Sequence, residues 1–305
     1  MSTPTNNSLF LIGGTGGLGT EVAKGLVTAT GFESKKAIVR DASSDKAQAL
    51  ADMGWTLVEV KDLTDADLLE TALAGVQTVV STLSGNDMVS LESNIIQSAK
   101  KTGATLFVPS QFGVDFYRWG TEFPFLAGKK AVQEAAAAAE LPVLNVFTGY
   151  FSDWIFGFFV DLENAKVTWI GDGSDKVSFT SRDDIGYVLA KALADPEYAQ
   201  GGSLSMQGDY ASFNEATKWL GESLGKDIAV EYMNADDAKK LESELLVKGL
   251  EGDVGAFFGS FKYHLMGEPA RGNDGCNLSK QAKDYGHELK TLKQVFGSGV
   301  YSGSS

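Results

Sequence analysis

The residues with the clearest chemical meaning form a glycine-rich turn near the start of the chain. The apolar run Leu9–Ile12 leads directly into the turn, and a helical segment follows. The glycines satisfy both G-x-G-x-x-G (Gly14, Gly16, Gly19) and G-x-x-G-x-x-G (Gly13, Gly16, Gly19). Glycine is needed where a diphosphate must reach backbone N–H groups at the start of a helix. The turn therefore predicts dinucleotide binding by Gly13, Gly14, Thr15, Gly16, Gly17, Leu18 and Gly19, the alternative being a turn that only packs helix on strand.

The end of the second expected strand, Ala37–Val39, carries the residues that choose the dinucleotide. An acidic residue there would bind the ribose 2'-hydroxyl of NAD, whereas an arginine would clamp the 2'-phosphate of NADP. Strand alternation puts Arg40 at the tip, and Lys46 can add a second positive charge. NADP(H) is therefore the expected cofactor. Two alternatives stay open. Arg40 forms a surface ion pair with Asp41, or the strand end differs by one residue, so that Asp41 is the residue that contacts the ribose.

Short apolar runs alternate with helical segments in the first half, which is the pattern of a doubly wound α/β sheet of the Rossmann type. Helices are expected from Asp65 to Gly75 and over Lys129–Glu140, where Pro142 blocks continuation. Residues 1–149 are thus predicted to form the NADP(H)-binding domain. The six expected strands are Leu9–Ile12, Ala37–Val39, Thr56–Val60, Thr78–Val80, Thr105–Val108 and Val143–Phe147.

The second half, residues 150–305, is predicted to be a smaller α+β lobe that binds the substrate, from which the chain can cross back to the sheet. Tyr150 and Phe151 leave the sixth strand and are candidates for the pocket wall, or they pack the two lobes together. The same alternatives apply to the aromatic residues between Trp154 and Phe159. Expected elements are a strand pair at Val167–Ile170 and Val177–Thr180, a strand at Ile228–Tyr232, and helices at Asp183–Leu193, Ser212–Leu224 and Ala235–Leu250.

Composition limits the partners and the location. A net charge of −14 disfavours nucleic acid and anionic membranes. The longest apolar segment is too short to span a bilayer, and Met1–Ser8 lacks the features of a signal peptide. His264 and His287 lie far apart, so no metal site is expected. Cys276 cannot form an internal disulfide and is expected to have no role, which fits the cytoplasm; a homodimer stays open.

Several motifs occur in the order in which a known family carries them. They are Gly13–Gly19, Val39-Arg-Asp41, Val60-Lys-Asp-Leu63, Val79-Val-Ser-Thr82, Phe107-Val-Pro-Ser-Gln-Phe-Gly113, Lys129 and Leu141-Pro-Val143, with Arg182-Asp-Asp-Ile-Gly186 as a less specific match. By these motifs the chain resembles the NmrA-like and isoflavone-reductase-like group of atypical short-chain dehydrogenases/reductases. The resemblance implies an NADPH-dependent reductase of a small aromatic or conjugated molecule, as in secondary metabolism. It adds Asp62, Leu63, Ser81, Thr82 and Ser110 to the expected cofactor site, and Gln111 and Phe112 to the substrate site.

The resemblance also implies a catalytic lysine. In relatives of the isoflavone-reductase kind, a lysine in the helix after the fifth strand contacts the cofactor and assists proton transfer, and Lys129 has that place. An ammonium group beside the reacting oxygen would stabilise its negative charge and then protonate it. Lys130 would point about 100° away on a helix and is assigned to solvent. The alternative for Lys129 is an exposed helix lysine without a role.

The chain also departs from the family pattern. Phe125 stands where the usual Tyr-x-x-x-Lys pair has its tyrosine, and Tyr187 with Lys191 fits that spacing but falls after the sixth strand, so we interpret it as a decoy. Gln111 replaces the glutamate that relatives often carry, which removes a candidate base. Two other functions stay open: a dinucleotide-binding redox sensor of the NmrA kind, and a non-redox isomerase or cyclase.

Overall fold

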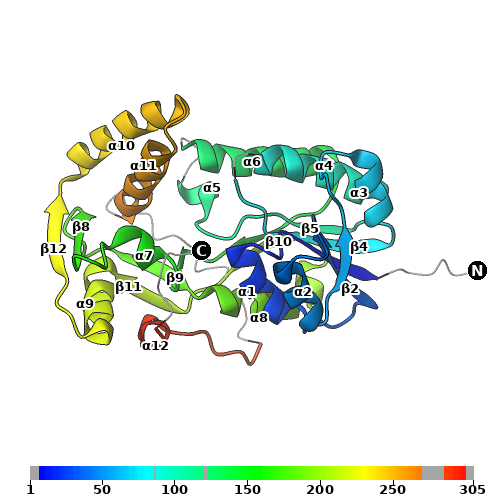
Figure 1. Cartoon of the computed structure of the whole chain (residues 1–305), viewed down its shortest axis with the longest axis horizontal. Coiled ribbons are helices and arrows are strands. Elements are labelled where there is room, and N and C mark those ends of the chain that lie inside the picture. Colours follow the sequence, from blue (N-terminus) through cyan, green and yellow to red (C-terminus); the bar gives the residue numbers. More distant parts are fainter. Residues whose placement is uncertain (1–6, 86, 120–122, 270–284, 300–305) are drawn as a thin grey trace, which may run out of the picture.

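The computed structural model describes residues 7–85, 87–119, 123–269 and 285–299 (Figure 1). The expectations for Cys276 and for the first six residues lie outside these ranges. Within the described ranges, no helix is both long and apolar enough to cross a membrane.

A five-stranded parallel sheet forms the centre of the first half, in the order β3-β2-β1-β4-β5. The fully buried β1 is central; its Leu9 and Leu11 enter one hydrophobic cluster, while Phe10 and Ile12 enter another on the opposite face. The chain order reverses between β1 and β4, which is where doubly wound folds bind ligands. The strands are β1 (Ser8–Ile12), β2 (Ser34–Val39), β3 (Thr56–Glu59), β4 (Val76–Ser81) and β5 (Leu106–Val108).

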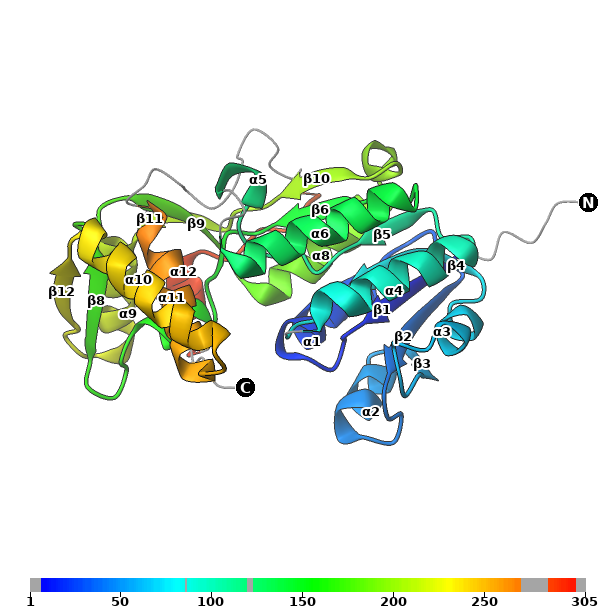
Figure 2. The same cartoon turned by 90° about the horizontal axis from the view of Figure 1, so that it is seen from above.

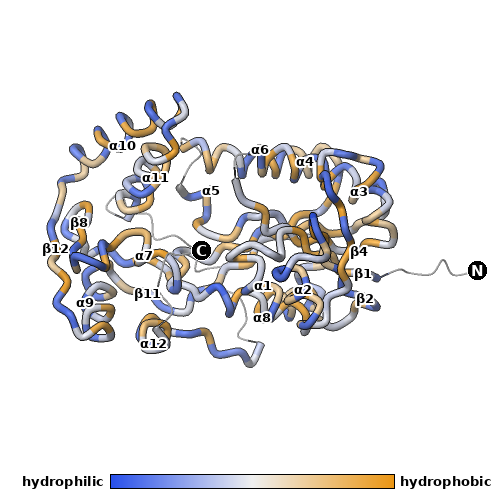
Figure 3. The backbone as a smooth tube through the Cα atoms, viewed as in Figure 1, coloured by the Kyte–Doolittle hydropathy of each residue, from blue (hydrophilic) through white to orange (hydrophobic). Residues whose placement is uncertain are grey.

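Helices cover both faces of this sheet (Figure 2). One face carries α1 (Gly17–Leu26), α2 (Asp45–Asp52) and α8 (Arg182–Ala192), and the other carries α3 (Ala66–Ala72), α4 (Met88–Lys101) and α6 (Pro124–Ala138). Figure 3 shows hydrophobic and hydrophilic turns alternating along α4 and α6, as expected of helices with one buried face. The expected start of α6 at Lys129 is wrong, because the helix begins at Pro124, in the first-turn position that favours proline.

The sixth expected strand, β6 (Leu144–Phe147), lies beyond β5, which it joins only through the bridge between Phe107 and Val143. It pairs in parallel with β10 (Gly202–Ser205), a strand from the second half of the chain. α8, also from the second half, packs tightly on α1. A Cβ at Gly186 would lie 2.2 Å from the Val22 carbonyl oxygen, so only glycine permits this contact. The division of the chain at residue 149 stays a prediction.

The remaining part of the second half contains two small sheets, β11-β9-β7 and β12-β8. The expected pairing of Val167–Ile170 with Val177–Thr180 is wrong. Both strands exist, as β8 and β9, but β8 pairs with β12, and β9 pairs with β11 and β7. The strands are β7 (Tyr150–Phe151), β8 (Lys166–Ile170), β9 (Lys176–Thr180), β11 (Asp209–Ser212) and β12 (Ala229–Met233). The helices are α5 (Phe116–Trp119), α7 (Ile155–Phe159), α9 (Phe213–Leu224), α10 (Ala235–Leu250), α11 (Val254–Gly267) and α12 (Leu292–Gly297), with a 3₁₀ turn at Pro196–Tyr198.

An aromatic core explains why these distant strands come together. Trp169 of β8 stacks on Phe213 of α9 with ring centroids 4.5 Å apart, and Phe159 meets both rings edge-on. Phe156 and Phe159 are almost completely buried in this core, whereas Trp154 and Phe158 stack on each other at the margin of the core. Contacts between segments far apart in the chain therefore decide the pairing in this half.

Candidate active site

The glycine turn leaves no room for side chains at two of its positions. Gly13 has φ of +83°, a conformation that only glycine adopts readily, and a Cβ at Gly19 would lie 2.1 Å from the Gly13 carbonyl oxygen. Gly16 precedes α1 and donates its N–H to the same oxygen at 3.0 Å. The spacing Gly13, Gly16, Gly19 is thus the one with structural meaning. It brings the backbone of the turn and the first N–H groups of α1 close together.

A cleft of about 340 Å³ opens between this turn and the ends of β2 and β4. Six of the expected cofactor residues line it, namely Gly13, Thr15, Gly16, Arg40, Leu63 and Thr82. The other nine do not: Gly14, Gly17, Leu18 and Gly19 belong to the turn, Lys46 is exposed on α2, Asp62 is hydrogen-bonded to Thr64, Ser81 and Ser110 are hydrogen-bonded to Glu92 of α4, and Lys129 is buried on α6. The cleft also has a lining that we did not predict, Leu83 to Gly85, Asp87 and Leu91, from the loop after β4 and from α4.

Arg40, which directly follows β2, lines the cleft, and Asp41 does not. Arg40 is exposed and forms no ion pair or hydrogen bond with any other residue that the structure describes. The Asp41 carboxylate instead accepts hydrogen bonds from the Ser43 hydroxyl and N–H, at 2.7 and 2.8 Å, which lower its pKa. The guanidinium group of Arg40 is therefore available to an anionic ligand.

Lys129 is a buried lysine, since only 5% of its surface is exposed. Its Nζ atom lies 4.8 Å from the ring centroid of Phe125, and Gly113 faces it, because a Cβ there would lie 4.0 Å away. Burial lowers the pKa of Lys129 to about 8, although the charge of Glu92 acts in the opposite direction. Within the described part of the chain, the ammonium group makes no hydrogen bond. Lys130, as expected, is exposed and pairs with Glu134 at 3.8 Å.

Sequence reasoning missed Glu92 of α4, a carboxyl group only 1% exposed. Its Oε1 atom accepts the Ser110 N–H at 2.8 Å, and the Ser81 hydroxyl is also hydrogen-bonded to it. Burial raises the pKa of Glu92 against these hydrogen bonds and the charge of Lys129. A signal was present: Glu92 falls on the helix face that also carries Met88, Ile95, Ile96 and Ala99, and this face is apolar.

The expected substrate residues are mostly buried. Phe112 packs in the core cluster on the α1 face, and Phe151 packs against the same cluster. The Tyr150 hydroxyl donates to the Leu265 carbonyl at 2.7 Å, which agrees with the packing alternative. Gln111 is 1% exposed, and its Nε2 has no hydrogen-bond partner among the residues that the structure describes. The substrate roles of these four residues stay predictions.

Tyr187 and Lys191, the other pair with the Tyr-x-x-x-Lys spacing, lie away from Lys129. Tyr187 stands on α8, on the opposite face of the sheet from α6, and stacks on His287 with ring centroids 5.0 Å apart. Its ring is partly exposed. This placement supports our interpretation of the spacing as a decoy.

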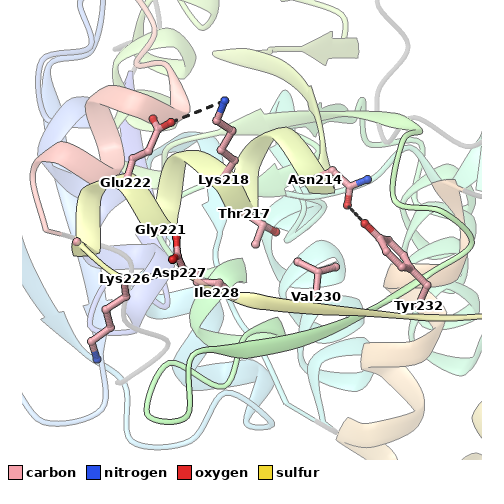
Figure 4. Close-up of a pocket in the computed structure, with 11 residues that line it drawn as sticks. Asn214, Thr217, Lys218, Gly221, Glu222, Lys226, Asp227, Ile228, Val230 and Tyr232 are labelled. Carbon is pink, nitrogen blue, oxygen red and sulfur yellow. Dashed lines mark hydrogen bonds and ion pairs between the residues drawn. The ribbon is translucent and has the colours of Figure 1, made fainter.

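A larger pocket, about 690 Å³, lies between α9 and β12 at the other end of the molecule (Figures 1 and 4). Lys218 reaches Glu222 on the same helix at 4.0 Å, and the Tyr232 hydroxyl donates to Asn214 at 3.1 Å. These side chains bind each other, and the pocket has neither a glycine turn nor a buried ionisable group. Its size therefore does not make it the candidate site.

Comparison with known proteins defines the class of this chain. Its fold is Rossmann-like: the leucoanthocyanidin reductase–NADPH binary complex from Vitis vinifera superposes with a TM-score of 0.80 at 19% identity, covering 96% of this chain and 99% of that one. The sequence profile of the NmrA-like family matches residues 5–290, so the chain belongs to that family.

Two curated relatives carry isoflavone reductase names. Isoflavone reductase homolog P3 of Arabidopsis thaliana is 31% identical over 207 residues, which cover 62% of this chain and 66% of the relative. Isoflavone reductase homolog IRL of Zea mays is 28% identical over 301 residues, which cover 91% of this chain and 94% of the relative. The likeness to the second relative thus extends through both halves of the molecule.

Proposed function

We propose that this protein is an NADPH-dependent reductase of a small aromatic or conjugated organic molecule. The observation that carries the proposal is the buried ammonium group of Lys129, which makes no hydrogen bond within the described chain. A lysine buried in this way costs stability unless a ligand uses it. The names of the relatives, which refer to isoflavone and leucoanthocyanidin reductases, support a flat aromatic substrate.

The residues around the cleft fit NADPH. Gly13 and Gly19 exclude side chains from the turn, so a diphosphate can approach the backbone N–H groups at the start of α1. Arg40 stands at the tip of β2 with its guanidinium group free within the described structure, and this group matches a 2'-phosphate. Asp41 is engaged with Ser43 and does not line the cleft, which disfavours NAD.

Bound NADPH would supply the hydride for the reduction. Lys129 would supply the other half of the reaction, a proton from its Nζ atom to the oxygen or carbon that becomes negatively charged. Because burial brings the pKa of Lys129 to about 8, the group is charged at neutral pH yet gives up its proton readily. Phe125 offers no competing proton and shields the ammonium group from water on one side.

We propose that the substrate binds between Lys129 and the second half of the chain, on the side where Phe125 meets Phe261 of α11 with ring centroids 5.4 Å apart. We further propose that the protein acts in the cytoplasm, in secondary metabolism, as the single cysteine and the family membership suggest. The homodimer also stays a proposal.

The substitution Lys129→Met tests the proposal. It should lower the rate of NADPH oxidation with an accepted substrate by about 10²–10⁴-fold, because the proton donor is lost. Binding of NADPH should change much less. The measurement is the decrease of NADPH absorbance with a panel of isoflavones, aryl ethers and quinones.

Lys130→Met is the matched control, since this neighbouring lysine is exposed and should be dispensable. If Lys129→Met turns over as fast as the natural protein, the assigned role is wrong. Tight NADPH binding without consumption across the whole panel would instead favour the redox sensor.

A further inference from the structure

Glu92 is unusual because it places a carboxyl group on the apolar face of α4. That face packs α4 against the sheet and against α6. Taking a carboxylate out of water costs several kcal/mol unless hydrogen bonds and an opposite charge compensate. A position that served only packing would be filled better by an apolar side chain. The residue therefore needs an explanation besides the stability of the helix.

The contacts of Glu92 fix its carboxylate at the edge of the sheet that faces the candidate site. Ser110 follows β5 and donates its N–H to Oε1 at 2.8 Å, while Ser81, at the end of β4, is hydrogen-bonded through its hydroxyl. Both serines are largely or fully buried at neighbouring strand ends. The carboxylate thus has a defined position relative to the sheet and cannot turn away into solvent.

Glu92 and Lys129 flank the same loop: Ser110 donates its N–H to Glu92, and a Cβ at Gly113 would lie 4.0 Å from Lys129 Nζ. The charge of Glu92 opposes the effect of burial on the pKa of Lys129. The other charged groups on α5, α6 and α11 have contacts of their own in the described structure. Lys130 pairs with Glu134 at 3.8 Å, Asp115 accepts the Tyr117 N–H at 3.0 Å, and His264 of α11 lies 3.1 Å from Glu242. Arg118 is exposed on α5. Among the described residues, Glu92 is the one whose charge acts on the pKa of Lys129.

We propose that Glu92 is a positioning residue for Lys129: its carboxylate, held by Ser81 and Ser110 on the other side of the loop that ends at Gly113, keeps the buried ammonium group charged. A buried lysine without a negative charge nearby would lose its proton and its ability to act as an acid. The inference concerns a residue that does not touch the substrate. The catalytic consequence of the inference rests on the proposed reductase function, whereas the effect of Glu92 on the protonation of Lys129 does not.

The substitution Glu92→Gln tests this directly, since glutamine keeps an oxygen that can accept the Ser110 N–H while removing the charge. Lysine labelled with ¹³C at Cε allows the titration of Lys129 to be followed by NMR, with Lys129→Arg identifying its signal. We expect the midpoint of Lys129 to fall by roughly one pH unit, as the loss of one nearby carboxylate would produce. Glu134→Gln, which removes an exposed carboxylate from α6 itself, should leave the midpoint unchanged.

A second measurement keeps the inference testable if Glu92→Gln does not fold. Coupling between two sites is reciprocal, so Lys129→Met should raise the titration midpoint of the Glu92 carboxyl group by the same amount. Glutamate labelled at Cδ gives this midpoint. An unchanged midpoint for Lys129 in Glu92→Gln, or for Glu92 in Lys129→Met, would overturn the inference.

Activity separates this inference from the proposed function. If both are correct, the basic limb of the rate against pH moves down in Glu92→Gln by the shift seen in the titration. A shifted titration in a protein that never consumes NADPH would leave the inference standing and refute the reductase. Normal turnover, with no shift in either limb of the pH–rate profile and none in the titration of Lys129, would refute the inference and leave the reductase function standing.

Discussion

The ionisable groups of the two halves of the molecule differ in the partners that surround them. In the second half, Glu242 of α10 is buried and lies 3.1 Å from both His264 Nδ1 and Lys239 Nζ, and Glu268 lies 3.9 Å from the same His264 nitrogen. In the first half, Lys129 has an aromatic ring and the charge of Glu92, and Arg40 has no partner among the described residues.

The pKa values follow from this difference. Burial acts to raise the pKa of Glu242, but the hydrogen bonds and charges of His264 and Lys239 lower it to about 2. For Lys129, burial wins and lowers the pKa to about 8. The charges of the α10–α11 pair stabilise each other and hence the fold. Arg40 at the cleft and the buried Lys129 on α6 form no ion pair among the described residues, which is typical of groups that bind a ligand.

The largest effect is expected on stability, when the contacts of Glu242 in the second half are removed. Glu242→Gln should lower the free energy of unfolding at neutral pH by about 3 kcal/mol, because a buried, paired carboxylate is lost. The pKa of Glu242 is depressed in the folded state, so its contribution is present above about 4.5 and is lost as the pH falls toward about 2. Urea unfolding at several pH values measures it.

Glu244→Gln is the control for that experiment, since Glu244 is exposed on the same helix. The two variants should differ clearly at neutral pH and converge in acid. A loss of stability that is equal for both variants, or independent of pH, would show that the α10–α11 pair does not stabilise the fold as we argue.

A smaller effect is expected in the first half, where the change should alter binding and not the fold. Arg40→Ala should weaken NADPH binding by roughly 10–100-fold, as the loss of a charged contact to a phosphate does, and leave NADH nearly unaffected. Lys46→Ala, which removes an exposed charge outside the cleft lining, should have a lesser effect. Fluorescence titration with both coenzymes gives the affinities, and equal losses for the two would refute the 2'-phosphate contact.

The first half could be predicted from the sequence because its signals are local. The glycine turn lies between β1 and α1, and Arg40 follows β2 directly, so a few neighbouring residues determine each feature. The same holds for α10, whose predicted bounds Ala235–Leu250 are confirmed: Asn234 caps its start by accepting the Asp237 N–H at 2.8 Å.

What could not be predicted depends on contacts between distant segments. β8 pairs with β12, and its Trp169 packs on Phe213 of α9, the helix that precedes β12; no local sequence pattern predicts this pairing. Glu92 looks like an ordinary helix glutamate until α4 is known to bury it beside Ser110 and α6. The sequence singles out Phe112 and Tyr150 as substrate candidates, but their burial in the core depends on elements elsewhere in the chain.

Calorimetric titration of the protein with NADPH tests the central claim most directly, since the roles of Arg40 and Lys129 both presuppose that the cleft holds this coenzyme. We expect saturable binding to the natural protein and binding at least 10-fold weaker to Gly19→Ala. The added Cβ would lie 2.1 Å from the Gly13 carbonyl oxygen, so the turn would have to move. Absence of heat with both NADPH and NADH, or undiminished binding by a folded Gly19→Ala, would contradict the account.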